Sequence, residues 1–206
     1  MSRAAEKEIA RVLSAPIGDD ARSAAERFAA RAEREGLVEV AYAAFDSPLG
    51  TGYLAATERG IVSVGLPNRA LDEFVAQLSA RVSPKVLELP TRLDRALREL
   101  DEYFAGRRHE FDLDLDRRLN PPGFYGKVLR ETAKLPFGVT STYGEVAARA
   151  GNPRAYRAAG TALGINPLPI VVPCHRVLRA GGVLGNYGGG PEMKEWLLRF
   201  EGAVDE

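Results

Sequence analysis

The stretch Val171-Val172-Pro173-Cys174-His175-Arg176-Val177 contains the only cysteine of the chain and one of its two histidines, side by side. An apolar run that ends at Pro-Cys-His predicts a buried strand that brings a thiol to a tight turn. The thiolate is the nucleophilic form, and neighbouring groups set its reactivity through its pKa. A lone cysteine is usually a small buried hydrophobic residue. The adjacent His175 and Arg176 favour a catalytic interpretation of Cys174.

The overall composition is that of a globular chain. Its 206 residues fit one large domain or two small ones. The single cysteine excludes an internal disulfide and a site with several thiolate ligands, which favours a reducing, cytoplasmic location. His109 and His175 are too few and too far apart in sequence to suggest zinc. The N-terminus has no signal-peptide pattern, and no apolar run is long enough to cross a bilayer, so we expect no membrane partner.

The formal charge is zero, but it is spread unevenly. Residues 1–120 carry 18 Lys and Arg against 21 Asp and Glu, whereas residues 121–206 carry 10 against 7. Between Glu145 and Glu192 every charged side chain is an arginine. These arginines are Arg149, Arg154, Arg157, Arg176 and Arg179. Such a patch could bind a phosphate backbone, and it could equally be a solvated face.

The first 118 residues show two kinds of pattern. Apolar residues at helical spacing predict helices at 4–14 and 20–35, so we interpret residues 1–36 as an accessory helical segment. Short β-rich runs joined by turns then predict an antiparallel meander with helices after it. The predicted strands are 38–45, 53–57, 61–66 and 86–89, and the predicted helices are 69–80 and 91–105. We assign them to an N-terminal α/β domain at 37–118 that ends in a strand edge or linker.

A break of turn-forming residues, Asn120-Pro121-Pro122-Gly123, separates the two composition regimes. We assign residues 119–206 to a mainly helical C-terminal domain. Helical spacing predicts a helix at 123–134 and a last amphipathic helix that ends near Glu201-Gly202. The glycine-rich residues 181–190 predict a loop before that last helix.

A helix-turn-helix pattern follows the first helix of this domain. Thr142 and Glu145 have the spacing of a capping box, so a helix is expected from there to about Ala150. Asn152 is the expected N-cap of a second helix at about 153–164. Two short helices joined by a glycine-containing turn are typical of the helix-turn-helix motif.

The second helix of this pair is poor in side-chain volume. Its small residues are Ala155, Ala158, Ala159, Gly160 and Ala162. Small side chains permit tight helix packing, and they also let a backbone approach a DNA groove. The minor groove reads sequence poorly, which suits a protein that searches for damage. Arg157 would then contact phosphate or enter the space that a base has left.

The stretch Pro173-Cys174-His175-Arg176-Val177 resembles the active-site signature of the O6-alkylguanine-DNA alkyltransferase family, the methylated-DNA–protein-cysteine methyltransferases. Other motifs stand in the family's order and spacing over residues 120–202. They are Tyr143-Gly144-Glu145-Val146-Ala147, Arg157-Ala158-Ala159-Gly160, Asn166-Pro167, Gly185-Asn186-Tyr187 and Glu201-Gly202. Residues 38–118 resemble the family's N-terminal domain only loosely, and we name no counterpart for residues 1–36.

The resemblance implies DNA repair by direct reversal. The damaged guanine flips out of double-stranded DNA from the minor-groove side, and a thiolate takes its O6-alkyl group. Cys174 would be the nucleophile, His175 would remove the thiol proton through a water, and Glu201 would orient His175. The product is a thioether, which thiol–disulfide exchange does not reverse, so each molecule should act once and need no cofactor.

The resemblance also assigns residues around the base. Tyr143 matches a phenol of the family that donates a hydrogen bond toward N3 of the leaving guanine. Asn166 matches an asparagine that ties the recognition helix to the cysteine turn. Arg157 matches the arginine that takes the place of the extruded base in the stack. From the residues alone, Tyr143 fits an aromatic packing residue in the first turn of its helix equally well. Asn166 likewise fits an ordinary turn residue before a proline. The remaining expected substrate and DNA contacts are Ala155, Tyr156, Ala158, Gly160, Pro169, Arg176, Val177, Gly185, Tyr187 and Gly188.

The chain departs from the family pattern at two positions. Gly188 stands where many relatives carry serine. A hydrogen bond donated by the backbone N–H at this position would be kept, whereas one donated by a side chain would be lost. Tyr156 is bulkier than the small residue expected in that helix, which would adjust DNA docking. The zinc-binding cysteines and the sensor domain of some relatives are absent from the sequence, so we expect neither zinc nor a transcriptional role.

Together these observations predict an α/β (α+β) fold: a small N-terminal domain of antiparallel sheet and helices, and a mainly helical C-terminal domain with a helix-turn-helix and a short strand that carries Cys174. The expected function is single-turnover transfer of an alkyl group from O6-alkylguanine to Cys174 by a monomer. The alternative is a non-catalytic protein that binds alkylated bases and marks lesions, against which the presence of Cys174 argues. A cysteine hydrolase ranks lower because its Cys and His are normally far apart in sequence. An activity in residues 1–118 ranks last because they offer no catalytic constellation.

Overall fold

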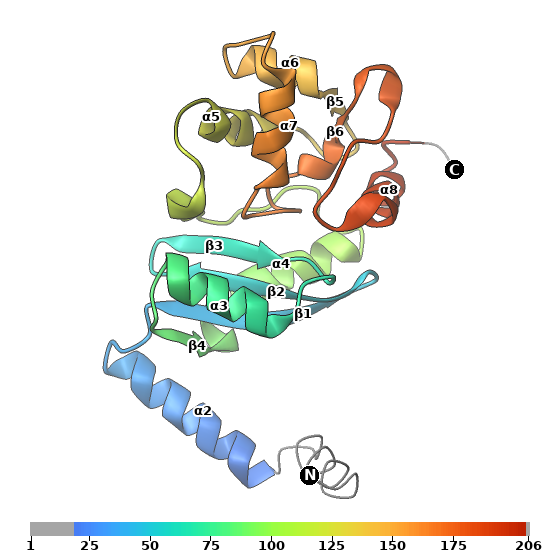
Figure 1. Ribbon diagram of the computed structural model, residues 1–206. Helices are drawn as coiled ribbons and strands as arrows, with labels where there is room; N and C mark the ends of the chain where they lie inside the picture. The colour runs from blue at the N-terminus through green and yellow to red at the C-terminus, as the bar shows by residue number, and fades with distance from the viewer. Residues whose placement is uncertain (1–18, 205–206) are drawn as a thin grey trace, which may run out of the picture. The chain divides into compact units, whose positions relative to one another are not determined.

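The computed structural model describes residues 19–204, which are shown in colour in Figure 1. The chain divides into two compact units, Met1–Val38 and Glu39–Glu206. In the first unit, helix α2 (Asp19–Arg34) confirms the helix predicted at 20–35. The helix predicted at 4–14 lies outside the described residues. No helix in the described part of the chain combines the length and apolar character needed to cross a bilayer.

The second unit begins with a four-stranded sheet. Its strands are β1 (Val40–Ser47), β2 (Gly50–Thr57), β3 (Gly60–Gly65) and β4 (Val86–Glu88), in the order β3-β2-β1-β4. The first three pair antiparallel, which confirms the predicted meander. The fourth strand pairs parallel to β1 because a helix crosses over between β3 and β4.

Two helices cover opposite faces of this sheet (Figure 1). On one face, Phe74 of α3 (Leu71–Arg81) is buried in a cluster with Val40. On the other, Phe104 of α4 (Asp94–Phe104) stacks on Phe45 at 6.4 Å between ring centroids. Val40 and Phe45 are an odd number of residues apart on β1, so their side chains point to opposite faces. The alternation of side-chain direction along β1 therefore presents one of these residues to each helix.

The segment after α4 returns along the edge of the sheet. Ile61 donates its backbone N–H to the Asp114 carbonyl at 2.8 Å, and Asp116 donates back to the Ile61 carbonyl at 2.8 Å. A side chain at Gly60 would collide with the Asp114 backbone, and its φ of 118° also favours glycine. The segment predicted as a strand edge or linker is thus a linker that pairs with β3 at a single bridge.

The C-terminal half is mainly helical. Helices α5 (Gly123–Thr132), α6 (Tyr143–Arg149) and α7 (Tyr156–Gly164) pack on one another, and α8 (Gly190–Phe200) follows the glycine-rich loop. Strands β5 (Ser141–Thr142) and β6 (Val177–Leu178) form a parallel pair of two residues each. A sheet-bearing N-terminal half and a helical C-terminal half confirm the predicted fold class.

The helix-turn-helix is present, with a shorter second helix than predicted. The capping box of α6 is complete: Glu145 N–H donates to Thr142 Oγ1 at 3.2 Å, and Thr142 N–H donates to the Glu145 carboxylate at 2.7 Å. Helix α7 begins at Tyr156, so the prediction of a start at 153 with Asn152 as N-cap was wrong. Asn152 Oδ1 instead accepts from Arg154 N–H at 3.2 Å, which closes a local turn before the helix.

Candidate active site

The cysteine lies on a turn, so the predicted strand beneath it was wrong. Cys174, His175 and Arg176 form one turn of 3₁₀ helix, and β6 begins directly after them. Pro173 has φ −78° and ψ 65°, and Cys174 N–H donates to the Val172 carbonyl at 2.8 Å, which is an inverse γ-turn. Ile170 has a φ of 73°, a value that β-branched residues rarely adopt. The apolar run therefore bends too sharply to pair as a strand.

Asn166 holds this turn through both ends of its amide. Its Nδ2 donates to the Val172 carbonyl at 2.8 Å and to Cys174 Sγ at 3.2 Å. Its Oδ1 accepts from Leu168 N–H at 3.1 Å. The residue lies two positions after α7, so it connects that helix to the cysteine turn. This hydrogen bond favours the thiolate form of Cys174, because a donor stabilises the charged sulfur.

His175, which directly follows Cys174 in the chain, forms a buried pair with Glu201. His175 Nε2 lies 3.0 Å from Glu201 Oε1, and both side chains are fully buried. Arg176 donates from Nε to Glu201 Oε2 at 2.7 Å and from Nη2 to Oε1 at 2.8 Å. Burial works to raise the pKa of Glu201, but the hydrogen bonds from His175 and Arg176 outweigh it and hold that pKa far below its ordinary value. Glu201 is therefore a carboxylate at every working pH.

The thiol and the imidazole are both neutral at rest. Burial raises the pKa of Cys174, against the opposing effects of the Asn166 hydrogen bond and the Lys194 charge. Burial lowers the pKa of His175, although Glu201 works to raise it. His175 Nδ1 is buried, and within the described chain no group hydrogen-bonds to it. A neutral thiol next to a neutral imidazole with a free ring nitrogen can be activated by proton transfer.

Two side chains of this site were missed by the sequence patterns. Tyr103, on α4, donates from its hydroxyl to Glu201 Oε1 at 2.6 Å. Lys194, on α8, donates from Nζ to the Val177 carbonyl at 2.6 Å and lies 5.9 Å from the centre of the Tyr143 ring. Tyr103 lies within the helix predicted at 91–105, and nothing in its local sequence distinguishes it from an ordinary buried aromatic residue. Lys194 follows Met193 on the buried side of α8. Because lysine is rarely buried, a lysine at this position of the helix indicates a functional role.

A cavity of about 260 Å³ opens onto the thiol. Its walls come from Asn166, Pro169, Cys174, Tyr187 and Gly188 and, from the sheet half of the chain, Leu66, Asn68 and Arg69. Asn68 Nδ2 donates to the Gly188 carbonyl at 2.9 Å, which joins the β3–α3 loop to the glycine-rich loop. The cavity is thus completed by both halves of the second unit.

A wider groove of about 950 Å³ runs over the helix-turn-helix face. Tyr156 and Arg157 are exposed on it, with the guanidinium of Arg157 5.6 Å from the Tyr156 ring centre. The Tyr143 ring lies between Gly160 of α7 and Gly185. A side chain at Gly185 would collide with the Tyr143 hydroxyl, so glycine is required there. Ala158 of α7 and Ala155, the residue just before that helix, are half-buried.

Two predicted contact residues face inward instead. Arg176 is buried, and besides Glu201 it binds the Leu135 carbonyl through Nη1 at 2.5 Å. Its charge is neutralised inside the protein, so its assignment to DNA contact was wrong. The side chain of Val177 is fully buried, and its carbonyl accepts the Lys194 ammonium. A contact from Val177 to a ligand is therefore restricted to its backbone.

Replacing Lys194 should make the thiol less reactive. Burial lowers the pKa of Lys194 to about 8, so the side chain is still mainly cationic at neutral pH, and its charge lowers the pKa of Cys174. We expect Lys194→Met to slow alkylation of Cys174 by iodoacetamide at neutral pH by about threefold, because the loss of the nearby charge lowers the fraction of thiolate. Lys127→Met, at an exposed position of α5, is the control and should leave the rate unchanged.

The chain matches known proteins over both halves of its second unit. Residues 40–117 match the family model "6-O-methylguanine DNA methyltransferase, ribonuclease-like domain", and residues 123–203 match "6-O-methylguanine DNA methyltransferase, DNA binding domain". A methylated-DNA–protein-cysteine methyltransferase of Methanosarcina acetivorans is 38% identical over 79% of this chain and 98% of its own. The Mus musculus protein of that name is 39% identical over 78% of this chain and 81% of its own.

Solved structures agree with these matches. The Mycobacterium tuberculosis O6-methylguanine methyltransferase is 35% identical over 81% of this chain and 95% of its own, with a TM-score of 0.69. A structure of the M. tuberculosis protein in complex with DNA is 36% identical over 79% of this chain and 93% of its own, also with a TM-score of 0.69. At this identity and coverage, the likeness extends to sequence as well as fold.

Proposed function

This chain belongs to the methylated-DNA–protein-cysteine methyltransferase family, and we propose that it removes alkyl groups from O6-alkylguanine in double-stranded DNA by moving them irreversibly to its own Cys174. It is a DNA-binding methyltransferase that repairs DNA by alkyl transfer. The observation that carries the finer proposal is one buried thiol that lines a cavity, accepts a hydrogen bond from Asn166 and is followed directly in the chain by His175, whose ring meets Glu201.

Activation of the thiol follows from the neutral resting state. His175 Nδ1 takes the proton of Cys174 through a bridging water, while Nε2 stays bound to Glu201. The thiolate sulfur then attacks the alkyl carbon, the S–C bond forms, and the C–O6 bond breaks with its electron pair leaving on the guanine. Glu201 stabilises the imidazolium that forms, because a buried carboxylate favours the charged ring.

The leaving guanine needs hydrogen-bond donors, since negative charge develops on it. Tyr143 is such a donor: burial raises the pKa of its phenol, so it keeps its proton. The backbone N–H of Gly188, on the cavity wall, is a second donor that needs no side chain. Pro169 and Tyr187 complete the walls around the alkyl group.

DNA approaches along the groove on the helix-turn-helix face. The small residues of α7 let its backbone enter the minor groove, and the exposed Arg157 fills the space of the flipped base. Tyr156 lies beside Arg157 and supports it through its ring face. The nucleophile, the base and its carboxylate partner all come from one chain, so the reaction requires only a monomer.

Mass spectrometry tests this proposal. Equimolar protein and duplex DNA with one O6-methylguanine should yield a single added methylene, mapped to the Cys174 peptide, and excess DNA should add no second one. Cys174→Ala should show no gain and should still bind the lesion. Lesion binding by the unaltered protein without a mass gain would contradict alkyl transfer and would favour a protein that only marks lesions.

A further inference from the structure

The hydroxyl of Tyr103 reaches the reacting half of the molecule from the sheet half. Tyr103 lies in the last turn of α4 with a fully buried side chain, and its hydroxyl donates to Glu201 Oε1 at 2.6 Å. The two residues are 98 positions apart in the sequence. This is the shortest of the hydrogen bonds to Glu201 among the described residues.

The same oxygen of Glu201 also serves His175. Oε1 has three neighbours that compete for it: the Tyr103 hydroxyl, Nη2 of Arg176 at 2.8 Å and Nε2 of His175 at 3.0 Å. A carboxylate oxygen has about two lone pairs, so a strong donor weakens its interaction with the others. The strength of the interaction between Glu201 Oε1 and His175 therefore depends on whether the Tyr103 hydroxyl is present.

We propose that Tyr103 is a positioning residue of the alkyl-transfer reaction, which fixes the Glu201 carboxylate and sets how strongly it retains a proton on His175. This inference rests on the proposed function of Cys174. Tyr103 is not among the residues that line the cavity. Its hydroxyl donates to Glu201 and also interacts with Arg176, so it acts on the reaction through the Glu201–Arg176 pair. The N-terminal domain then contributes to the chemistry as well as to the cavity wall.

Aromatic packing fixes the Tyr103 ring. Its centroid lies 5.3 Å from that of Phe111, 5.5 Å from Phe200 and 6.0 Å from Phe137. Phe200 is the residue before Glu201, and Phe137 comes from the C-terminal half as well. The ring is thus enclosed by both halves of the second unit, and its hydroxyl has one direction in which to point.

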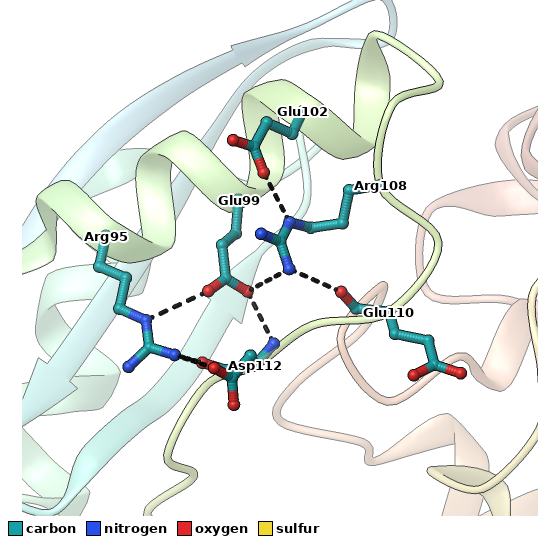
Figure 2. A network of polar contacts seen from close by, with 6 residues as sticks. All are labelled: Arg95, Glu99, Glu102, Arg108, Glu110 and Asp112. Atoms are coloured by element: carbon teal, nitrogen blue, oxygen red, sulfur yellow. Dashed lines mark hydrogen bonds and ion pairs between the residues drawn. The ribbon is translucent and has the colours of Figure 1, made fainter.

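A polar network holds the Phe111 side of this enclosure in place (Figure 2). The buried carboxylate of Glu99, on α4, accepts from Arg95 Nε at 3.2 Å and from Asp112 N–H at 2.8 Å, and Arg108 lies 3.4 Å away. Arg108 also binds Glu102 at 2.7 Å and the Glu110 carbonyl at 2.9 Å. These contacts hold the segment after α4 against the helix. Phe111, in that segment, packs on Tyr103.

The direction of the effect follows from the ionisation of the groups involved. Burial raises the pKa of Tyr103, and the charge of Glu201 raises it further, so the phenol remains a donor throughout the working range. Without the hydroxyl, Glu201 interacts more strongly with His175 and favours the imidazolium. The other titratable groups around the pair are Arg176, Lys194, Tyr187 and Cys174, and a change at Tyr103 leaves all of them in place.

The experiment is the pH dependence of single-turnover methyl transfer by the full chain. Tyr103→Phe keeps the ring and removes only the hydroxyl. We expect the acid limb of its profile to move up by about 0.5 pH unit, so that the rate at a pH on that limb falls about threefold. Incorporation of 3-fluorotyrosine at position 103, whose phenol is a stronger donor, should move the limb in the opposite direction.

Thr57→Val is the matched control. Thr57 Oγ1 also donates at 2.6 Å to a buried carboxylate, that of Asp116, and has no contact with Glu201. Both variants should lose a similar amount of unfolding free energy. Only Tyr103→Phe should shift the acid limb of the pH profile of methyl transfer. A Tyr103→Phe profile that coincides with those of Thr57→Val and the unaltered protein would overturn the inference. The pH dependence of alkylation by iodoacetamide reports the ionisation of Cys174 and His175 in the absence of DNA. If methyl transfer from DNA failed altogether, this second profile would still show whether Tyr103→Phe shifts the acid limb, so the two failures are distinguishable.

Discussion

Glu201→Gln should be among the most damaging single substitutions in the protein. The variant keeps the shape of the side chain and removes the charge that Arg176 binds at 2.7 and 2.8 Å. A buried guanidinium would lose its counter-ion, which typically costs about 3–5 kcal/mol of unfolding free energy. His175 would lose its carboxylate partner as well, so we expect alkyl transfer to slow by about 100-fold, the lower end of what a general base contributes.

The pH dependence of stability distinguishes the charge of Glu201 from its shape. Hydrogen bonds from His175 and Arg176 outweigh the opposing effect of burial and depress the pKa of Glu201 below its ordinary value of 4.5. A depressed pKa contributes stability that is complete above 4.5 and is lost as the pH falls below that value. Denaturant unfolding should therefore show a large gap between the unaltered protein and Glu201→Gln at neutral pH, and a smaller gap in acid.

Glu195→Gln supplies the control on the same helix. Glu195 pairs with Arg199 at 2.8 Å, but both side chains are nearly half exposed. An exposed pair of this kind contributes about 0.5 kcal/mol or less. Equal stability of Glu201→Gln and Glu195→Gln at neutral pH would contradict the role assigned to the buried carboxylate.

The elements that sequence patterns predicted correctly depend on neighbours close in the chain. The first three strands are short β-rich runs joined by tight turns, so their antiparallel pairing needs no distant partner. The capping box at Thr142 and Glu145 is local in the same sense, since its members are three residues apart. The family resemblance added Glu201 as the partner of His175, and the two side chains do meet, although their catalytic role stays a prediction.

The predictions that were wrong or missing concern residues whose surroundings are set by tertiary contacts. Arg176 looked like a DNA contact because an arginine in a basic region usually faces solvent, and only the fold shows that Glu201 neutralises it. The run before Cys174 has the composition of a strand, but its backbone bonds locally, from Val172 N–H to the Leu168 carbonyl at 2.7 Å, and leaves no edge for pairing. Tyr103 could not be assigned from its helix, because its partner is in the other half of the chain.

Asn166→Ala should release the turn that carries the nucleophile. Three hydrogen bonds converge on this one side chain, and they connect the end of α7, the backbone before the inverse γ-turn and the thiol of Cys174. Because the variant leaves the Leu168 N–H and the Val172 carbonyl without these partners, we expect a loss of about 2–3 kcal/mol of unfolding free energy. The displaced sulfur should slow alkyl transfer by about 100-fold, the typical result of a shift near 1 Å at a reacting atom.

The reactivity of the thiol separates the two effects of this substitution. The Asn166 hydrogen bond works to lower the pKa of Cys174, so its loss should raise that pKa and slow alkylation by iodoacetamide at neutral pH. Asn152→Ala is the control, because Asn152 is exposed and its side chain accepts from a single backbone N–H. If Asn166→Ala slowed methyl transfer but left the iodoacetamide rate unchanged, Asn166 would act on the position of the DNA substrate, and its proposed hold on the sulfur would be wrong. A parallel fall in both rates, with lesion binding unchanged, is the outcome that the geometry predicts, because the asparagine contacts the nucleophile and the turn beneath it.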